Sequence, residues 1–255
     1  MNNITIDDVV KRSLIHGRVI CGSVLKYYEE KLPLVNISED IKIITVIGKG
    51  QKDSCVLKKS NITDNQIEIF EVENYKAWYS KIDGLRNYIN DNYDELPEYI
   101  LYMDGFDTLV INDFNSPKEI LDFYKCKVLF NSTVGFWHTG AKSPNSDEKY
   151  FEILYTKIKH ELLEKTQNKF NLDKNNETSL NSGVFVGEKD FVLKIINEAY
   201  DYMSGDPNKG FPYGTNCDQS VFKFLHNKYF DDISIDFYNK ISIWGSNLNF
   251  NKDVN

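Results

Sequence analysis

The sequence predicts an α/β domain built on a mostly parallel sheet with helices on both faces. Three runs rich in β-branched and aromatic residues, at 42–47, 99–103 and 127–131, are too short for helices and are expected to be buried strands. Segments with helical spacing of apolar residues, the longest at 148–170, separate or follow these runs. Strands that alternate with helices are typical of parallel sheets, because each helix returns the chain to the same edge.

The N-terminal part is expected to differ from the rest of the chain. Residues 5–32 carry an irregular apolar stripe at helical spacing, which Pro33 ends. We therefore predict an N-terminal helical extension over residues 1–39 and the α/β domain over residues 40–255.

The elements of the α/β domain follow in order after its first strand. A second strand is expected at 66–72, and Lys81 then opens a helix over 82–92. Ser116 and Pro117 are the N-cap and first-turn residues that start a helix. That helix is expected to end near residue 124. The other expected elements are a strand at 184–186, helices at 191–203 and 218–228, and short strands at 233–236 and 240–244.

Composition and charge exclude several classes of function. With 255 residues, 41% of them hydrophobic, the chain has enough apolar surface for one large core. The net charge of −8 argues against binding nucleic acid, which requires a basic face. No apolar run approaches membrane-spanning length and the first residues lack a signal-peptide pattern, so we expect a cytoplasmic protein with no membrane span. The four cysteines are too scattered for a zinc site or a disulfide framework.

Two acidic residues follow the central predicted strand. Asp104 and Asp107 would lie at its carboxyl end, the edge at which ligands bind in open α/β sheets. Two neighbouring carboxylates repel each other unless a cation lies between them, and oxygen ligands suit Mg²⁺ or Mn²⁺. The segment by itself leaves a second interpretation open, because Asp-Gly is a common turn pair and aspartates after a strand often bind backbone amides.

Three further segments carry candidate site residues. Trp137 lies in a loop after the third predicted strand, where it would contact a ligand or pack the loop against the domain. Asn181, Ser182 and Gly183 offer short polar side chains and a glycine for close approach to a polyhydroxyl ligand. Asp218 starts a helix, so it is either an N-terminal cap or an acid directed into the same cleft.

Taken in sequence order, these segments form a pattern. The chain reads ITVIGKG, then a lysine at a helix start, then ILYMDGFDTLV, VLFNS followed by FW, LNSGVFVG and DQSVF. This series, over residues 41–243, resembles the glycosyltransferase domains of procollagen galactosyltransferases and multifunctional lysyl hydroxylases. The resemblance implies a GT-A fold, Mn²⁺ or Mg²⁺ as cofactor, and a UDP-sugar donor whose sugar is transferred with retention.

The resemblance also implies roles for individual residues on the donor side. Asp104 and Asp107 match the metal-binding acids of the family, which places Asp104 beside the donor as well. Lys81 matches a lysine that contacts the donor's diphosphate, and Thr45 lies in the matching first strand of the nucleotide-binding region. Trp137 matches a tryptophan beside the sugar.

The remaining matches concern the sugar pocket and the transfer step. Asn181, Ser182 and Gly183 match the segment that lines the donor-sugar pocket. Asp218 matches an acid that is essential for transfer.

One departure from the family pattern concerns the metal. The family's third metal ligand is a histidine in a His-Gly-Asn segment near the domain's C-terminus, but this chain has no histidine after His226. The nearest likeness is WGSN at 244–247. Either the cation has two protein ligands, with diphosphate and water completing its coordination, or the chain lacks that segment; a reduced metal affinity is expected in both cases.

The predicted function is transfer of a hexose, glucose or galactose, from its UDP derivative to a hydroxyl of a protein or glycan acceptor. The first alternative is a sugar-nucleotide-binding or glycan-binding module with the same fold and no turnover, which the missing histidine favours. The second is a phosphatase of the haloacid-dehalogenase type. The segment MDGFDTLV of this chain faintly resembles the Asp-x-Asp-x-Thr motif of that superfamily, with Phe106 in place of the second acid.

Overall fold

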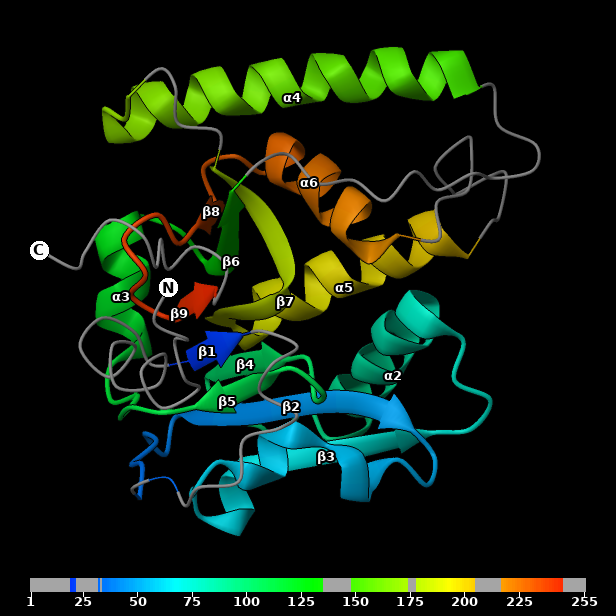
Figure 1. The fold of residues 1–255 in the computed structure, drawn as a ribbon, viewed down its shortest axis with the longest axis vertical. Helices are drawn as coiled ribbons and strands as arrows, with labels where there is room; N and C mark the ends of the chain where they lie inside the picture. Colours follow the sequence, from blue (N-terminus) through cyan, green and yellow to red (C-terminus); the bar gives the residue numbers. More distant parts are fainter. Residues whose placement is uncertain are drawn as a thin grey trace, which may run out of the picture.

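A six-stranded central sheet organises the fold (Figure 1). The computed structural model describes residues 19–21, 32, 34–134, 148–173, 178–204 and 217–244. Within them the strand order is β3-β2-β4-β7-β6-β8. The strands are β2 (Ile41–Gly48), β3 (Ile67–Val72), β4 (Tyr99–Met103), β6 (Val128–Val134), β7 (Thr178–Glu188) and β8 (Ile233–Ile235).

All strands of this sheet except β7 run in the same direction. β2 is parallel to β3 and β4, and β6 is parallel to β8. β7 is antiparallel to both of its neighbours, β4 and β6. The prediction of a mostly parallel sheet is therefore confirmed for the described part of the chain.

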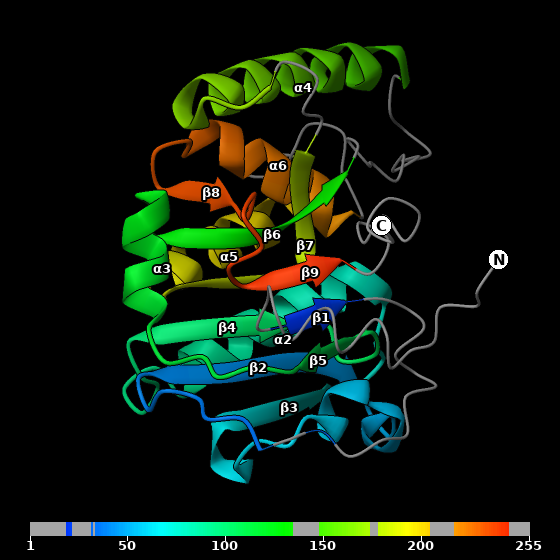
Figure 2. The same ribbon diagram turned by 60° about the vertical axis from the view of Figure 1, so that its left-hand side comes forward.

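Helices cover both faces of the sheet, as predicted. α2, α5 and α6 pack on one face, α3 packs on the other, and α4 lies against α6 (Figures 1 and 2). The helices are α2 (Ala77–Asp91), α3 (Pro117–Tyr124), α4 (Glu148–Phe170), α5 (Lys189–Met203) and α6 (Asp218–Lys228). None of these described helices is both long enough and apolar enough to cross a membrane.

A second, smaller sheet lies on the same face as α3 (Figure 2). Its order is β5-β1-β9, with β1 antiparallel to β5 and parallel to β9. Its strands are β1 (Val19–Cys21), β5 (Thr108–Val110) and β9 (Ser242–Trp244). Three short 3₁₀ helices follow β2 along the chain: η2 (Lys52–Ser54), η3 (Val56–Lys59) and η4 (Asp64–Gln66).

Four aromatic rings pack against one another in the core at the centre of the sheet. Phe185 of β7 stacks on Tyr102 of β4 at 5.1 Å between ring centroids, and it also packs against Phe130 of β6 at 4.8 Å. Phe130 in turn contacts Phe222 of α6 at 4.9 Å. All four side chains are fully buried. They fix β4, β7, β6 and α6 relative to one another, and the polar residues discussed below extend from the same elements.

The prediction that residues 5–32 are helical, with a break or kink at Gly17 and Gly22, is wrong for Val19–Cys21, which form β1. Val19 is fully buried and its strand is inserted between β5 and β9. The apolar residues that suggested a helical stripe are β-branched here, and pairing with strands about 90 and 220 residues further along the chain decides their conformation. The rest of the predicted extension lies outside the described residues, apart from 32 and 34–39, and the boundary at residue 39 stays a prediction.

Two predicted elements begin earlier than expected. α2 starts at Ala77 rather than at residue 82, so Lys81 lies one turn inside the helix. No side chain before the helix caps it; instead the hydroxyl of Ser80 accepts the backbone N–H of Lys76. β7 starts at Thr178, so Asn181–Gly183 belong to the strand instead of preceding it. The other predicted elements of the α/β domain lie within three residues of their predicted bounds, whereas β5 and the three 3₁₀ helices were not predicted.

A buried carboxylate holds the last strand of the small sheet in place. Asp236, which follows β8, is fully buried and accepts a hydrogen bond from the hydroxyl of Tyr124 at 2.6 Å. Its two oxygens also accept the backbone N–H groups of Lys240, Ile241 and Ser242 at 2.7–3.1 Å. These bonds form the turn that leads from the central sheet into β9.

Removing this carboxylate is expected to destabilise the protein strongly. Asp236→Ala leaves several buried donors without an acceptor, so we expect the free energy of unfolding to fall by about 3 kcal/mol or more. Urea denaturation followed by circular dichroism measures the change. The control is Asp232→Ala, which removes a partly exposed ion pair with Lys127 and should cost about 1 kcal/mol or less. Equal losses in the two variants would contradict the structural role of Asp236.

Candidate functional site

The candidate site begins at the end of β4, on the edge of the sheet that the sequence predicts. Asp104 is held through its backbone, because its N–H donates to the carbonyl of Gly183 at 2.8 Å and its carbonyl accepts from the hydroxyl of Thr108. Its carboxylate is 39% exposed, and Oδ1 accepts from the hydroxyl of Tyr102 at 3.0 Å. The described contacts of the carboxylate are thus with side chains, which favours a ligand-binding acid over an aspartate that binds backbone amides.

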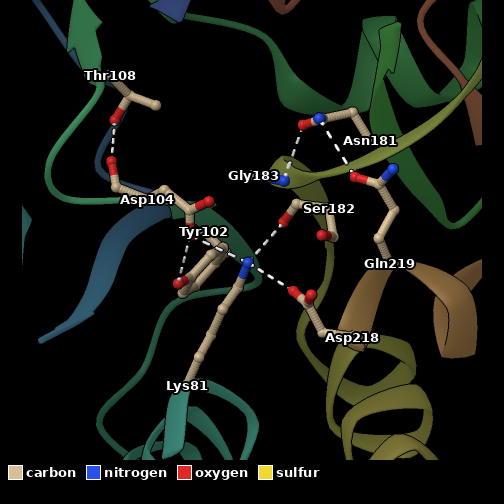
Figure 3. A network of polar contacts seen from close by, with 9 residues as sticks. All are labelled: Lys81, Tyr102, Asp104, Thr108, Asn181, Ser182, Gly183, Asp218 and Gln219. Atoms are coloured by element: carbon tan, nitrogen blue, oxygen red, sulfur yellow. Dashed lines mark hydrogen bonds and ion pairs between the residues drawn. The ribbon is translucent and has the colours of Figure 1, made fainter. Parts of the chain in front are cut away.

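A buried lysine connects this carboxylate to the rest of the site (Figure 3). Lys81 is the fifth residue of α2 and is only 3% exposed. Its ammonium lies 3.0 Å from Asp104 Oδ1 and 2.7 Å from Asp218 Oδ2, and it donates to the carbonyl of Ser182 at 3.1 Å. One cation therefore joins the end of β4, the middle of β7 and the start of α6.

Asp218 is the first residue of α6 and is 2% exposed. The N-cap is Cys217, and no side-chain hydrogen bond caps the helix, so the capping interpretation of Asp218 is not supported. The helix N-terminus favours a negative charge at this position, and the ion pair with Lys81 compensates for burial. The structure thus directs this acid toward Asp104 across the lysine.

An irregularity in β7 brings the backbone of Ser182 to the lysine. Phe130 of β6 pairs with Phe185, but the next residue, Asn131, pairs with Asn181, so residues 182–184 have no partner on β6. Bulges of this kind re-aim the strand and its backbone groups. Here the carbonyl of Ser182 reaches Lys81, and Gly183 lies against the carboxylate of Asp104.

The side chain of Asn181 holds the bulge in place. Its Oδ1 accepts the backbone N–H of Gly183 at 2.9 Å, and its Nδ2 donates to Oε1 of Gln219 at 3.3 Å (Figure 3). Sequence reasoning missed Gln219 and Tyr102 as members of the network. The spacing of Tyr102 and Asp104 was an available signal, because side chains two apart on a strand point to the same face.

The charges in this network shift the pKa values of its members. Burial alone lowers the pKa of Lys81, but the charges of Asp104 and Asp218 outweigh burial and raise it above its ordinary value. Burial raises the pKa of Asp104, while Lys81 opposes the rise and Asp218 adds to it. Burial also raises the pKa of Tyr102 well above its ordinary value, so its hydroxyl stays protonated and donates to Asp104.

Asp107 supplies a further carboxylate beside Asp104. Burial raises its pKa to about 6 and the negative charge of Asp104 adds to the rise, while Lys81 and a hydrogen bond from the backbone N–H of Asp107 itself oppose it. When the acids are ionised, the three carboxylates of Asp104, Asp107 and Asp218 outnumber the single ammonium of Lys81 by two charges. A divalent cation with oxygen ligands fits this excess and would bind at Asp104 and Asp107.

The described residues hold no group of three or more His, Cys, Asp and Glu side chains placed to bind a metal. A cation at Asp104 and Asp107 would therefore take its other ligands from groups outside these described side chains. Residues 245–247, the nearest likeness to the histidine segment of the resembled family, lie outside the described part of the chain.

One predicted site residue, Thr45, is not part of this network. Thr45 is fully buried, and its hydroxyl lies beneath Gly105, where an added Cβ would be 2.9 Å away. The carbonyl of Gly105 accepts from the backbone N–H of Leu57 and from the thiol of Cys55, so this layer supports the turn between Asp104 and Asp107. Trp137 lies outside the described residues.

Comparison with known proteins adds no family assignment. No protein-family model matches the chain, and no curated protein sequence matches it significantly. The functional interpretation therefore depends on the geometry described above and on the sequence resemblance.

Replacing Asp107 by asparagine is expected to stabilise the metal-free protein. The pKa of this carboxyl is about 6 in the folded protein and about 4 in an unfolded chain, so raising the pH from 4 to 6 favours unfolding. Above pH 6 the loss of stability caused by ionising Asp107 is complete, and asparagine avoids this loss because it does not ionise. Because the side chain is partly exposed, we expect a gain of only about 1 kcal/mol at pH 7.

Thermal unfolding in the presence of a chelator measures this effect, and the advantage of Asp107→Asn should disappear at pH 4. Adding Mn²⁺ at pH 7 should make the wild type more stable than Asp107→Asn, since we expect only the wild-type protein to gain stability from the ion. A variant that is less stable than the wild type in chelator would contradict the assignment.

Gly183→Ala tests the close approach between β7 and Asp104. The new Cβ would lie 3.0 Å from Asp104 Oδ2 and 3.0 Å from Asn181 Oδ1, so the carboxylate must move. We expect a stability loss of about 1 kcal/mol and Mn²⁺ binding weakened about 10-fold by isothermal titration. The matched control is Gly50→Ala, where φ is +77° and no atom lies within 4 Å of the new Cβ. It should lose stability through backbone strain and bind Mn²⁺ normally.

Proposed function

We propose that this protein is a metal-dependent glycosyltransferase that transfers a hexose from a UDP-sugar to a hydroxyl of a protein or glycan acceptor. The observation that carries the proposal is the pairing of a partly exposed Asp104 with Asp107 at the carboxyl edge of β4, opposite the buried acid Asp218. The sequence resemblance implies a role for each of these three acids. The GT-A assignment is part of the proposal, and the mostly parallel sheet with helices on both faces supports it.

The proposed mechanism assigns different tasks to the acids. Asp104 and Asp107 hold the divalent cation, which when bound stabilises the charge that develops on the leaving diphosphate. Asp218 is the acid required for transfer. Its position at the start of α6, across Lys81 from Asp104, separates it from the cation-binding pair.

A second candidate function is binding of a sugar nucleotide without turnover. The observation that favours it is the small number of metal ligands: two acids, no histidine after His226, and no group of three ligand side chains in the described residues. Such a protein would bind UDP with Mn²⁺ but release no UDP from a UDP-sugar.

Two assays together decide between these functions. Isothermal titration with UDP and Mn²⁺ measures binding, and UDP release from UDP-glucose and UDP-galactose, with and without acceptor hydroxyls, measures turnover. The proposal expects both, and expects Asp104→Ala or Asp107→Ala to lower the rate about 100-fold or more. The control is Asp122→Ala, which removes only an exposed ion pair with Lys118 and should change neither measurement.

Other outcomes are equally informative. Binding of UDP without release of UDP from any UDP-sugar would support the non-catalytic module. Release of phosphate from a simple monoester would support the phosphatase. Full turnover after alanine replaces both Asp104 and Asp107 would overturn the proposed function.

A further inference from the structure

We propose that Lys81 is a positioning residue that holds Asp104 and Asp218 against each other and makes no hydrogen bond to the donor. This differs from the diphosphate contact that the resemblance implies for the lysine. The inference deepens the proposed function and, in its catalytic part, rests on it.

The hydrogen-bonding capacity of Lys81 is the first argument. An ammonium has three N–H donors and accepts nothing. Three oxygens surround it within 3.1 Å: Asp104 Oδ1, Asp218 Oδ2 and the carbonyl of Ser182. The ammonium donates one hydrogen bond, to Ser182, and forms ion pairs with the two carboxylates, and Lys81 is only 3% exposed. A diphosphate oxygen would have to displace one of these three protein oxygens to reach the ammonium.

The rigidity of the lysine is the second argument. α2 packs closely on the sheet at Gly84. A Cβ added there would lie 2.6 Å from Val46 and 2.9 Å from Val72, which leaves no room for a larger residue. Ile82 and Leu85, which flank Gly84, are fully buried. The ammonium also lies 4.9 Å from the ring centroid of Tyr102, which fits a cation–π contact. Helix, ring and three acceptors together define one position for the charge.

The consequence for Asp104 is that its two oxygens differ. Oδ1 is engaged by both Lys81 and the hydroxyl of Tyr102, whereas Oδ2 faces Gly183. We infer that Oδ2 is the oxygen through which Asp104 would hold a cation. Lys81 and Tyr102 orient the carboxylate for this task without touching substrate.

The functional test separates turnover from nucleotide binding. In Lys81→Met we expect the turnover number to fall about 100-fold, while the Kd for UDP at saturating Mn²⁺ changes less than about 3-fold. A residue that contacts the diphosphate would instead weaken UDP binding about 10-fold or more. The latter result would overturn the proposal. Lys76→Met, which removes an exposed lysine just before the same helix, is the charge-matched control and should change neither value.

A stability test does not depend on any activity. In the wild-type background, Asp218→Asn breaks a buried ion pair and should lower the unfolding temperature. In the Lys81→Met background, Asp218 is a buried charge that has lost its cation, so the same Asp218→Asn change should raise the unfolding temperature. The double variant Lys81→Met/Asp218→Asn therefore also provides a folded protein for the UDP titration if Lys81→Met alone folds poorly. Its Kd for UDP should match that of Asp218→Asn.

The outcomes distinguish the two proposals. If the sign of the Asp218→Asn effect does not reverse, Lys81 does not hold the acids together, whether or not the protein binds UDP. If the sign reverses in a protein that binds no UDP, the positioning of the acids stands and the proposed glycosyltransferase function fails.

Discussion

The contact on which the rest of the site depends is the buried bridge Asp104–Lys81–Asp218. A lysine that is 3% exposed is tolerated only when its charge is paired and its donors have acceptors. Here the acceptors come from the end of β4, the middle of β7 and the start of α6. The buried ammonium of Lys81 is stable only if these three elements lie next to one another. The need to pair this one charge therefore also fixes the positions of Asp104 and Asp218.

The apolar core holds these same elements in fixed positions relative to one another. The same strands and helix that carry the polar groups also carry the packed rings of Tyr102, Phe185, Phe130 and Phe222. Tyr102 serves both parts, since its ring packs on Phe185 and its hydroxyl donates to Asp104. Beyond the bridge, burial and the charge of Asp104 raise the pKa of Asp107, and Lys81 offsets this rise only in part. Such a destabilising group at the carboxyl edge of a sheet is typical of a binding site.

Much of the fold was predictable because it depends on local patterns. The apolar runs that form β2, β4 and β6, and the periodic segments that form α4, α5 and α6, are visible in short windows of sequence. The site was predictable only in part. Asp104 and Asp107 follow directly from their place after a buried strand. The partners of Lys81 did not, because Ser182 and Asp218 lie 101 and 137 residues further along the chain. The start of α2 was missed because Ser80, inside the helix, provides its capping contact.

The amino-acid sequence by itself determined the class of fold, the edge of the sheet at which the acids lie and the excess of negative charge there. Burial of apolar runs and the direction of parallel strands are sufficient to establish these features. Tertiary structure alone decided that Val19–Cys21 form a strand, that β7 runs against its neighbours, and that its bulge delivers a carbonyl to Lys81. Each of these depends on pairing between segments far apart in the chain, where the conformation of a few residues is set by their partners and not by their own preferences.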